Sequence, residues 1–496
     1  MNIIIYNRLT KFIDLGARKL ENTGTIKHVL CSDDRKLSII VFSLFFSWLL
    51  AFPFQGQVLY LIANQYNIDP KNMVFGSIVA HFLGLFFSGF FVKTMRNAKY
   101  LMLFSVIFCI VGTSIFFLNP SMLWYIFIII SSLFSGICVA AWGYYFKKCT
   151  PTNERIKTAA DVLIFSNILM IIMNMVAINV SAYAGLSLSI LALFCGLFFI
   201  VKLPENDEVD INPPRKMESM RVTKPLAFLC LFIAIITINS GLMYQVINPA
   251  FAHHEFLVSW YWAVPYIVAI YIIKNLPKSA NRTYLLYVAI AMIGFAFIAF
   301  MIFDRSVISY LIVDTLMLGA CGVYDLFWWS ILGEMVDFNK NPAKILGIGL
   351  SANVMGVLIG GLIGNAIATT EIQNMNSSVV ALTVVFITLI FLPVLHKQLL
   401  MILENHVYLT VFNDMSKDKQ TEVIGGIILI GQLTERESEI ARLLLKGRTY
   451  KMIATELYLS ENTVKTHIKN IYSKFNIQSK TELVKLLMEK YPSTFK

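Results

Sequence analysis

Long apolar runs recur along most of this sequence and constrain its fold more than any other feature. Six such runs lie between residues 37 and 203, and six more lie between residues 225 and 400. Each holds roughly 20 residues, which is enough for a helix to cross the hydrocarbon core of a bilayer. A spanning segment must satisfy its backbone hydrogen bonds internally, and a helix does so. The sequence therefore predicts an all-α membrane bundle of twelve spans.

The composition excludes the main alternatives. Charged residues make up 14% of the chain and apolar residues 57%, whereas about a quarter of a soluble protein is charged. The aromatic content of 13% excludes a disordered chain. The seven cysteines form neither a CxxC pair nor a cluster with histidine, so we predict no disulfide framework and no metal site. Because no nucleophile elbow or phosphate loop is present either, we expect no enzyme and no cofactor.

The basic residues gather in alternate loops of the predicted bundle. In the other loops only Lys71 and Arg305 are basic. The positive-inside rule places the basic loops in the cytoplasm, so both termini are predicted to be cytoplasmic. Residues 1–36 precede the first span and carry Ile5, Leu9 and Phe12 near one helical face. This segment is interpreted either as an amphipathic helix on the inner leaflet or as a cytoplasmic tail.

A polar segment, residues 204–224, divides the membrane domain 37–400 into halves 37–203 and 225–400. Two six-span halves with a cytoplasmic linker resemble the major facilitator superfamily, whose ligand site lies between the halves near the midplane. That family's G-x-x-x-D-x-x-G-R loop reads Gly89-Phe-Phe-Val-Lys93-Thr-Met-Arg96 here. Lys93 stands at the Asp position and the second Gly is missing. Because the family's motif accompanies the transport cycle, this departure argues against active transport.

The composition changes after Leu400. Residues 401–430 are predicted to be a linker, and residues 431–496 a small soluble helical domain. Thr434-Glu-Arg-Glu437 is a capping box that opens a helix, and Gly447 ends it. Thr449 opens a second helix and Ser460 opens a third. Ser479-Lys-Thr-Glu482 is a second capping box, which opens a fourth helix.

The third of these helices has two faces. Its apolar residues recur at helical spacing and are expected to face a core: Val464, Ile468, Ile471 and Phe475. Its polar residues lie away from that stripe: Asn462, Lys465, Thr466, Lys469 and Ser473. Twelve Lys or Arg against seven Asp or Glu in residues 431–496 suit attraction to phosphate. The pattern predicts a helix-turn-helix that presents a recognition helix.

This segment resembles the LuxR-type (GerE, NarL) DNA-binding domain. The resemblance rests on Leu433-Thr-Glu-Arg-Glu437, Gly447, Ile453-Ala454, Leu459-Ser-Glu-Asn-Thr-Val-Lys-Thr-His467 and Lys474-Phe-Asn-Ile477. It implies a site on double-stranded DNA formed by Lys465, Thr466, Lys469, Asn462, Thr463, Thr449 and Lys451. It also implies that the last helix, with Leu483, Leu486 and Leu487, helps two copies pair on DNA. The competing interpretation of Lys465 and Lys469 is a solvated charged face.

Ionisable residues within spans are costly and indicate function. Asp314 and Asp325 are eleven residues apart, so they share a helical face with Tyr310 and Cys321 and could line a cavity for a cationic or phenolic ligand. Alternatively, Asp325 pairs with a cytoplasmic Lys or Arg, and Asp314 with a hydroxyl or amide. The remaining candidate ligand residues are Gln55, Gln57, Asn239, Tyr244 and Trp142.

These observations predict a membrane-embedded, one-component transcriptional regulator. A small molecule would reach the transporter-like domain, and the cytoplasmic C-terminal domain would bind DNA. The resemblance implies location in a bacterial plasma membrane, with the lipid bilayer as a further partner. The alternative is an active secondary transporter with a regulatory DNA-binding tail.

Overall fold

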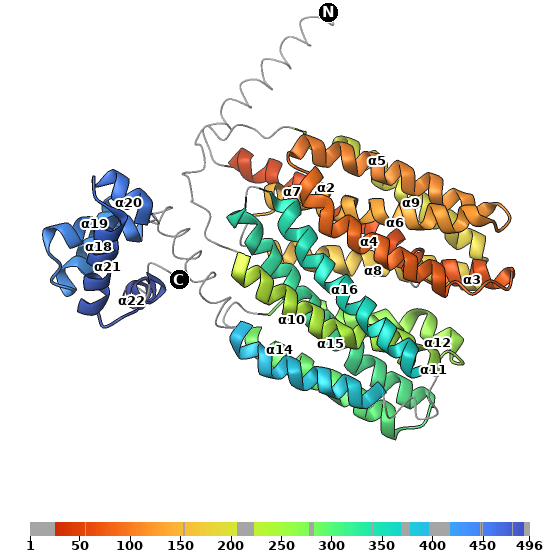
Figure 1. The fold of residues 1–496 in the computed structure, drawn as a ribbon. Coiled ribbons are helices and arrows are strands. Elements are labelled where there is room, and N and C mark those ends of the chain that lie inside the picture. The colour runs from red at the N-terminus through yellow and green to blue at the C-terminus, as the bar shows by residue number, and fades with distance from the viewer. Residues whose placement is uncertain are drawn as a thin grey trace, which may run out of the picture. The chain divides into compact units, whose positions relative to one another are not determined.

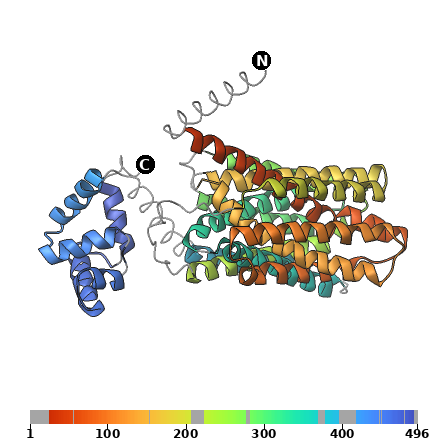
Figure 2. The same ribbon diagram turned by 90° about the horizontal axis from the view of Figure 1, so that it is seen from above.

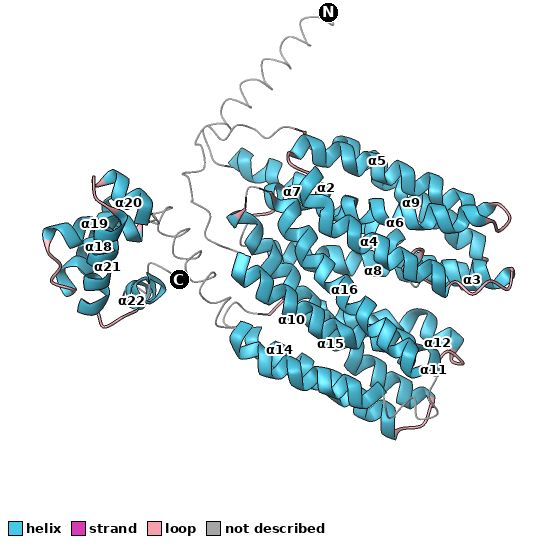
Figure 3. Cartoon of the chain, in the orientation of Figure 1, coloured by secondary structure: helices cyan, strands magenta, loops and turns pink. Residues whose placement is uncertain are grey.

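The structure is a computed structural model. It describes residues 25–490 except 55, 152–153, 206–222, 277–281, 340, 369–376, 396–416, 447, 449 and 479. Within this part the chain is helical and contains no strand (Figure 3), which confirms the predicted all-α class. Part of the predicted amphipathic segment, residues 1–24, lies outside the described residues. The chain divides into two compact units, a membrane unit and a C-terminal unit, and each is described by itself.

The first half of the membrane unit contains eight α-helices and a 3₁₀ turn (Ile115–Phe117) in its described residues. The α-helices are α2 (Thr25–Ala51), α3 (Gln57–Gln65), α4 (Lys71–Phe91), α5 (Met95–Ser114), α6 (Met122–Ala141), α7 (Gly143–Cys149), α8 (Arg155–Asn179) and α9 (Ala182–Lys202). Hydroxyl side chains at the N-caps begin several of them. Thr94 accepts a hydrogen bond from Asn97 N at 3.1 Å, and Ser181 accepts one from Ala184 N at 3.0 Å. These caps satisfy backbone donors that a helix start leaves without partners.

The second half ends with a helix at Ser377–Leu395. Before it come α10 (Thr223–Leu242), a π-helical turn (Met243–Ile247), α11 (Asn248–Ala250), α12 (Glu255–Trp260), α13 (Val264–Lys274), α14 (Arg282–Ile302), α15 (Val307–Met335), a 3₁₀ turn (Val336–Phe338) and α16 (Pro342–Ala368). Figures 1 and 2 show the long helices of both halves lying lengthwise beside one another.

Eleven helical segments among the described residues are long and apolar enough to cross a membrane. The first predicted span falls instead on α2 and α3, which are separated in the sequence by residues 52–56. At Gly56 a Cβ atom would lie 1.7 Å from the carbonyl oxygen of Ala51. Only glycine permits this close approach of two backbone segments. Together with Pro53, it explains why a single straight helix does not form here.

The C-terminal unit contains α18 (Lys417–Ile430), α19 (Glu435–Leu445), α20 (Tyr450–Glu456), α21 (Glu461–Lys474) and α22 (Lys480–Lys490). Figure 1 shows these five helices gathered together, and they share one hydrophobic core. The four helices predicted from the sequence correspond to α19–α22. The fifth, α18, lies within the segment 401–430 that was predicted as a linker.

Candidate functional site

The recognition helix predicted from the sequence is α21, and its apolar stripe faces the core. Val464, Ile468 and Ile471 are buried beside Ile440 and Leu444 of α19. Helix α19 begins with the predicted capping box, because Glu437 N donates to Thr434 Oγ1 at 3.3 Å and Thr434 N donates to Glu437 Oε2 at 2.9 Å. The core therefore fixes which face of α21 remains open.

The open face of α21 carries most of the predicted DNA-contacting residues. Asn462, Lys465, Thr466 and Lys469 are all exposed. Lys465 Nζ lies 3.1 Å from Glu461 Oε1, one turn earlier on the same helix. Basic and amide side chains on an accessible helix face are the groups that contact phosphates and base edges in a major groove. This face therefore has the chemistry that DNA binding requires.

The other predicted DNA-contacting residues differ in their surroundings. Thr463 is half-buried, and its hydroxyl lies 2.8 Å from Ser460 Oγ, so it belongs to the N-cap of α21. Thr449 and the side chain of Lys451 lie outside the described residues. Asn470 is exposed on α21 and was missed by sequence reasoning, although amides can read adenine.

The leucines of α22 were predicted to help two copies pair on DNA. Leu483 and Leu487 are fully buried in the unit's own core, while Leu486 is half-buried.

Lys474 joins the end of α21 to the start of α19. Its Nζ donates to Glu437 Oε2 at 2.6 Å and to the carbonyl oxygen of Gln432 at 3.1 Å. Burial alone would raise the pKa of Glu437, but hydrogen bonds from Lys474 and Thr434 outweigh it, so the pKa of Glu437 is lowered. The carboxylate is therefore held in its charged form between two helices.

In the membrane unit, Asp325 lies in a polar cluster between α10, α13 and α15. Tyr266 OH donates to Asp325 Oδ2 at 2.8 Å. Nearby, Tyr324 OH lies 2.7 Å from Ser240 Oγ. Asp325 has no ion pair among the described residues, and its partner is a phenol rather than a cytoplasmic Lys or Arg. A half-buried carboxylate beside several hydroxyl groups could bind a polar or cationic group.

Three other predicted ligand residues carry buried polar atoms without hydrogen-bond partners in the described part of the chain. They are Asp314 through Oδ2, Tyr310 through its hydroxyl, and Asn239 through both amide atoms. All three side chains are buried. Leaving such groups unpaired costs free energy. The unpaired atoms are therefore places where a ligand or water could supply the missing hydrogen bonds.

The remaining predicted ligand residues do not form one group. Trp142 is fully buried and donates from Nε1 to Ser38 Oγ at 2.9 Å, while its ring packs on Phe42 with centroids 4.3 Å apart. It packs within the bundle in this conformation. Gln57 is half-buried at the start of α3, and Tyr244 is half-buried in the π-helical turn. Gln55 lies outside the described residues.

Ion pairs join the two halves at the end where α8 begins and α13 and α15 finish. Arg155 of α8 makes two hydrogen bonds to Asp337, at 2.6 and 2.8 Å, and one to Gly333 O. Lys274 of α13 contacts Asp161 of α8, which also lies 3.3 Å from Arg35 of α2. Arg155 and Asp337 are 182 positions apart in the sequence, so no local sequence pattern identifies them as partners.

Asn341 makes a second kind of contact between the halves. Its Oδ1 accepts from Lys344 N at 3.1 Å, at the start of α16. Its Nδ2 donates to the carbonyl oxygens of Gly89 and Val92, at the end of α4, at 2.8 and 2.9 Å. One side chain thus satisfies backbone groups at the ends of two helices. It binds the loop where Lys93 departs from the superfamily motif.

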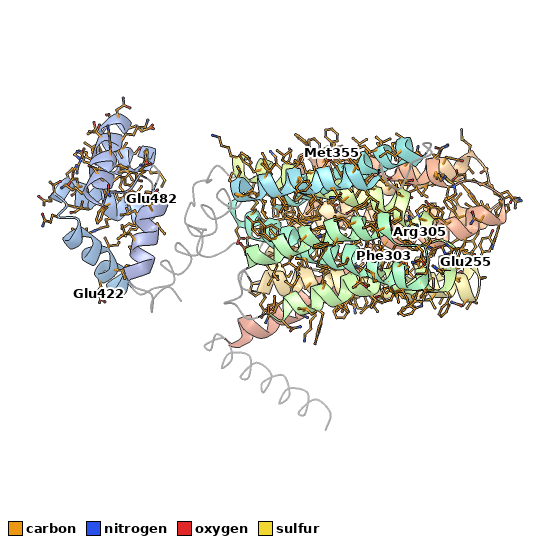
Figure 4. All side chains as sticks on the ribbon, turned by 90° about the horizontal axis from the view of Figure 1, so that it is seen from below. Glu255, Phe303, Arg305, Met355, Glu422 and Glu482 are labelled. Carbon is orange, nitrogen blue, oxygen red and sulfur yellow. The ribbon has the colours of Figure 1, made fainter. Side chains whose placement is uncertain are left out.

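The opposite end of the bundle includes Glu255, Phe303 and Arg305, which Figure 4 labels near one another. There the guanidinium of Arg305 lies over the Phe300 ring, 4.0 Å from its centroid. His253 and His254 each approach the carbonyl oxygen of Arg305, at 2.9 and 2.8 Å. No group of three or more His, Cys, Asp or Glu in the described residues could hold a metal ion.

Comparison with known proteins identifies relatives of the C-terminal unit. Residues 431–487 match the family described as "Bacterial regulatory proteins, luxR family". The spore germination protein GerE of Bacillus subtilis is 42% identical over 52 residues, which cover 10% of this chain and 70% of GerE. The uncharacterized response regulatory protein YgeK of Escherichia coli is 52% identical over 54 residues, 11% of this chain. The match spans only 37% of YgeK's own length.

The membrane unit is similar to solved structures of transporters. The human organic anion transporter MFSD10 has a TM-score of 0.55 at 14% identity, covering 72% of this chain and 98% of that one. The proton:xylose symporter XylE, of the major facilitator superfamily, has a TM-score of 0.55 at 9% identity, covering 73% of this chain and 94% of that one. At these identities the likeness shows the fold alone, and it confirms the predicted helical, transporter-like fold.

Proposed function

Because the chain belongs, through its C-terminal domain, to the luxR family of bacterial regulatory proteins, we propose that it is a one-component transcriptional regulator embedded in the inner membrane. The membrane unit binds a small molecule, and the C-terminal unit binds DNA. The observation that carries the proposal is the basic open face of α21, on a luxR-type core, in the same chain as a transporter fold.

In this proposal α21 enters the major groove. Lys465 and Lys469 contact phosphates or base edges, and Asn462 and Thr466 make further polar contacts. Lys465 leaves Glu461 when it reaches the DNA, because both groups lie on the surface and their pairing contributes little. Two copies bind a two-fold site, as helix-turn-helix dimers do. Since Leu483 and Leu487 lie in the unit's own core, pairing uses the other residues of α22.

The membrane unit senses its ligand by changing the relation between its halves. Asp325, Asp314, Tyr310 and Asn239 supply the polar groups that a ligand would meet. The ion pairs Arg155–Asp337 and Lys274–Asp161 hold the halves together at one end. A ligand that binds more tightly to one arrangement of the halves shifts the equilibrium toward it. The positive-inside rule places the ion-paired end, and the C-terminal unit, in the cytoplasm.

The first experiment is a genome-wide occupancy map of the tagged full-length protein. Wild type is compared with a Lys465→Ala/Lys469→Ala double variant and with Lys446→Ala, a control at an exposed lysine of the same unit outside α21. We expect discrete peaks in wild type and in the control, and their loss in the double variant. In vitro, losing two phosphate contacts should lower the salt-dependence slope of binding by about two.

A second experiment tests sensing. Asp314→Asn and Asp325→Asn remove the ionisable carboxyl group without removing volume and leave the C-terminal unit unchanged. We expect these variants to alter how occupancy responds to growth conditions, while the purified C-terminal unit binds its DNA as before. Absence of peaks for wild type under several conditions would contradict DNA binding. Substrate uptake by membrane vesicles would then favour a secondary transporter.

A further inference from the structure

Helix α18 lies outside the family match yet belongs to the DNA-binding core. The match begins at residue 431, whereas α18 covers Lys417–Ile430. Val423 and Ile424 are only 3% and 2% exposed, and they pack in the same cluster as Ile440, Ile468 and Leu483. Ile428 packs against this cluster from its edge. The C-terminal unit thus contains one helix that precedes the residues matched by the family.

The two residues that follow α18 pack against the C-terminal end of the recognition helix, α21. Gly431 follows α18, and a Cβ atom there would lie 2.3 Å from Cζ of the Phe475 ring, just after α21. The next residue, Gln432, has a positive φ of 44°, and its carbonyl oxygen accepts from Lys474 of α21 at 3.1 Å. A displacement of α18 therefore moves the backbone against which the C-terminal end of α21 is packed.

Tertiary packing, rather than helix propensity, holds α18 in place. Gly425 and Gly426 lie in the middle of its 14 residues, and glycine is a poor helix former. At Gly425 nothing lies within 4 Å of the position where a Cβ would be, so no close contact requires the glycine. A short helix with this composition is marginal without its packed face. The stability of α18 therefore depends on its contacts with the core of α19–α22.

We propose that α18 is a coupling helix that sets the DNA affinity of the C-terminal unit. When α18 is docked, the Gly431–Gln432 turn holds Lys474 and Phe475, and α21 is fixed for binding. When α18 is released, the last turn of α21 loosens and affinity falls. In the sequence, α18 is the first described helix after the last helix of the membrane unit. The effect on DNA rests on the proposed function, whereas the coupling to α21 does not.

The test uses the C-terminal unit, residues 417–496, which has its own core. Val423→Asp places a charge in that core and should undock α18. Gly425→Ala should strengthen docking, because it favours the helix and meets no neighbour. Glu422→Ala is the matched control, since Glu422 is the adjacent exposed residue (Figure 4). A truncated unit that begins at Gly431 covers the case in which Val423→Asp fails to fold.

Two quantities are measured: amide hydrogen exchange in α21 and affinity for a duplex carrying a mapped site. We expect Val423→Asp and the truncation to speed exchange in the last turn of α21 at least tenfold and to weaken DNA binding tenfold or more. Gly425→Ala should slow that exchange, and Glu422→Ala should change neither quantity. Unchanged exchange in α21 after truncation would overturn the coupling. If wild type bound no DNA, the proposed function would fail, and hydrogen exchange alone would still decide the coupling.

Discussion

Glu437 shows how one side chain makes the stability of the C-terminal unit depend on pH. It is buried, and it accepts hydrogen bonds from Lys474 Nζ and from Thr434 N. Its pKa is lowered in the folded chain because these bonds outweigh its burial. A group whose pKa is lower in the folded state stabilises that state above its unfolded-state pKa. This stabilisation is lost as the pH falls through the folded-state pKa.

We therefore expect the unfolding temperature of the C-terminal unit to fall as the pH drops below about 4, near the ordinary pKa of a glutamate. Glu437→Gln should remove about 1.5–3 kcal/mol at neutral pH, the value of hydrogen bonds to a charged group, and should flatten the acid dependence. Thermal unfolding between neutral and acidic pH measures both effects. Glu435→Gln, at an exposed glutamate of the same helix turn, should leave the profile unchanged.

At the scale of single residues, local contacts could be predicted from the sequence, whereas contacts between distant residues could not. The Thr434–Glu437 capping box could be predicted because both partners lie within one turn. The bond from Lys474 to Glu437 could not, because the two residues are distant in sequence and meet only through packing. Asp325 illustrates the same limit. Its place on a polar face follows from helical spacing, but its partner Tyr266 belongs to another helix.

At the scale of elements, α16 packs against α10 through glycines. At Gly360 a Cβ atom would lie 2.1 Å from the carbonyl oxygen of Ile238, and at Gly356 it would lie 2.3 Å from that of Ala234. At the neighbouring Gly361 the nearest atom would be 3.9 Å away, on the side chain of Gln245. Small residues allow helices in membranes to approach closely. Gly356 and Gly360 of α16 lie against the backbone of α10, whereas Gly361 has no such close neighbour.

We expect Gly360→Ala to destabilise the membrane unit by about 1–3 kcal/mol, the usual cost of overpacking, because the two backbones must move apart. Gly361→Ala serves as the control and should be tolerated. The measurement is the thermal unfolding of purified full-length protein in detergent, followed by aggregation or tryptophan fluorescence. Equal unfolding temperatures for the two variants would show that α10 and α16 separate without cost.

Elements with strong periodicity could be predicted from the sequence, and those shaped by packing could not. The buried stripe of α21 follows from the spacing of Val464, Ile468 and Ile471. Helix α18 does not, because Gly425-Gly426 reads as a break and its stability comes from the core of the following helices. In the first span, Pro53 lies in the break between α2 and α3, but the close approach of Gly56 to the carbonyl oxygen of Ala51 does not follow from the spacing of apolar residues.

At the scale of the whole molecule, the layout of two six-span halves with a C-terminal DNA-binding domain follows from apolar runs and a local motif. How the halves meet does not, because the contacts between them join residues far apart in sequence. Arg155 with Asp337, and Asn341 with Gly89 and Val92, are such contacts. They gather at one end of the membrane unit, where they would have to break for the halves to separate.

A cross-link between the halves tests whether this end opens during sensing. At Gly143 of α7 a Cβ atom would lie 3.4 Å from Cβ of Leu346 of α16, close to the spacing of about 3.5–4.5 Å in disulfides. We expect Gly143→Cys/Leu346→Cys to cross-link readily in oxidised membranes. Adding Asp337→Asn should slow cross-linking severalfold, because Arg155 loses its charged partner. As a control, adding Asp69→Asn instead removes an exposed ion pair with Lys71, and it should leave the cross-linking rate unchanged. If Asp337→Asn leaves the cross-linking rate unchanged, the ion pair does not hold the halves together.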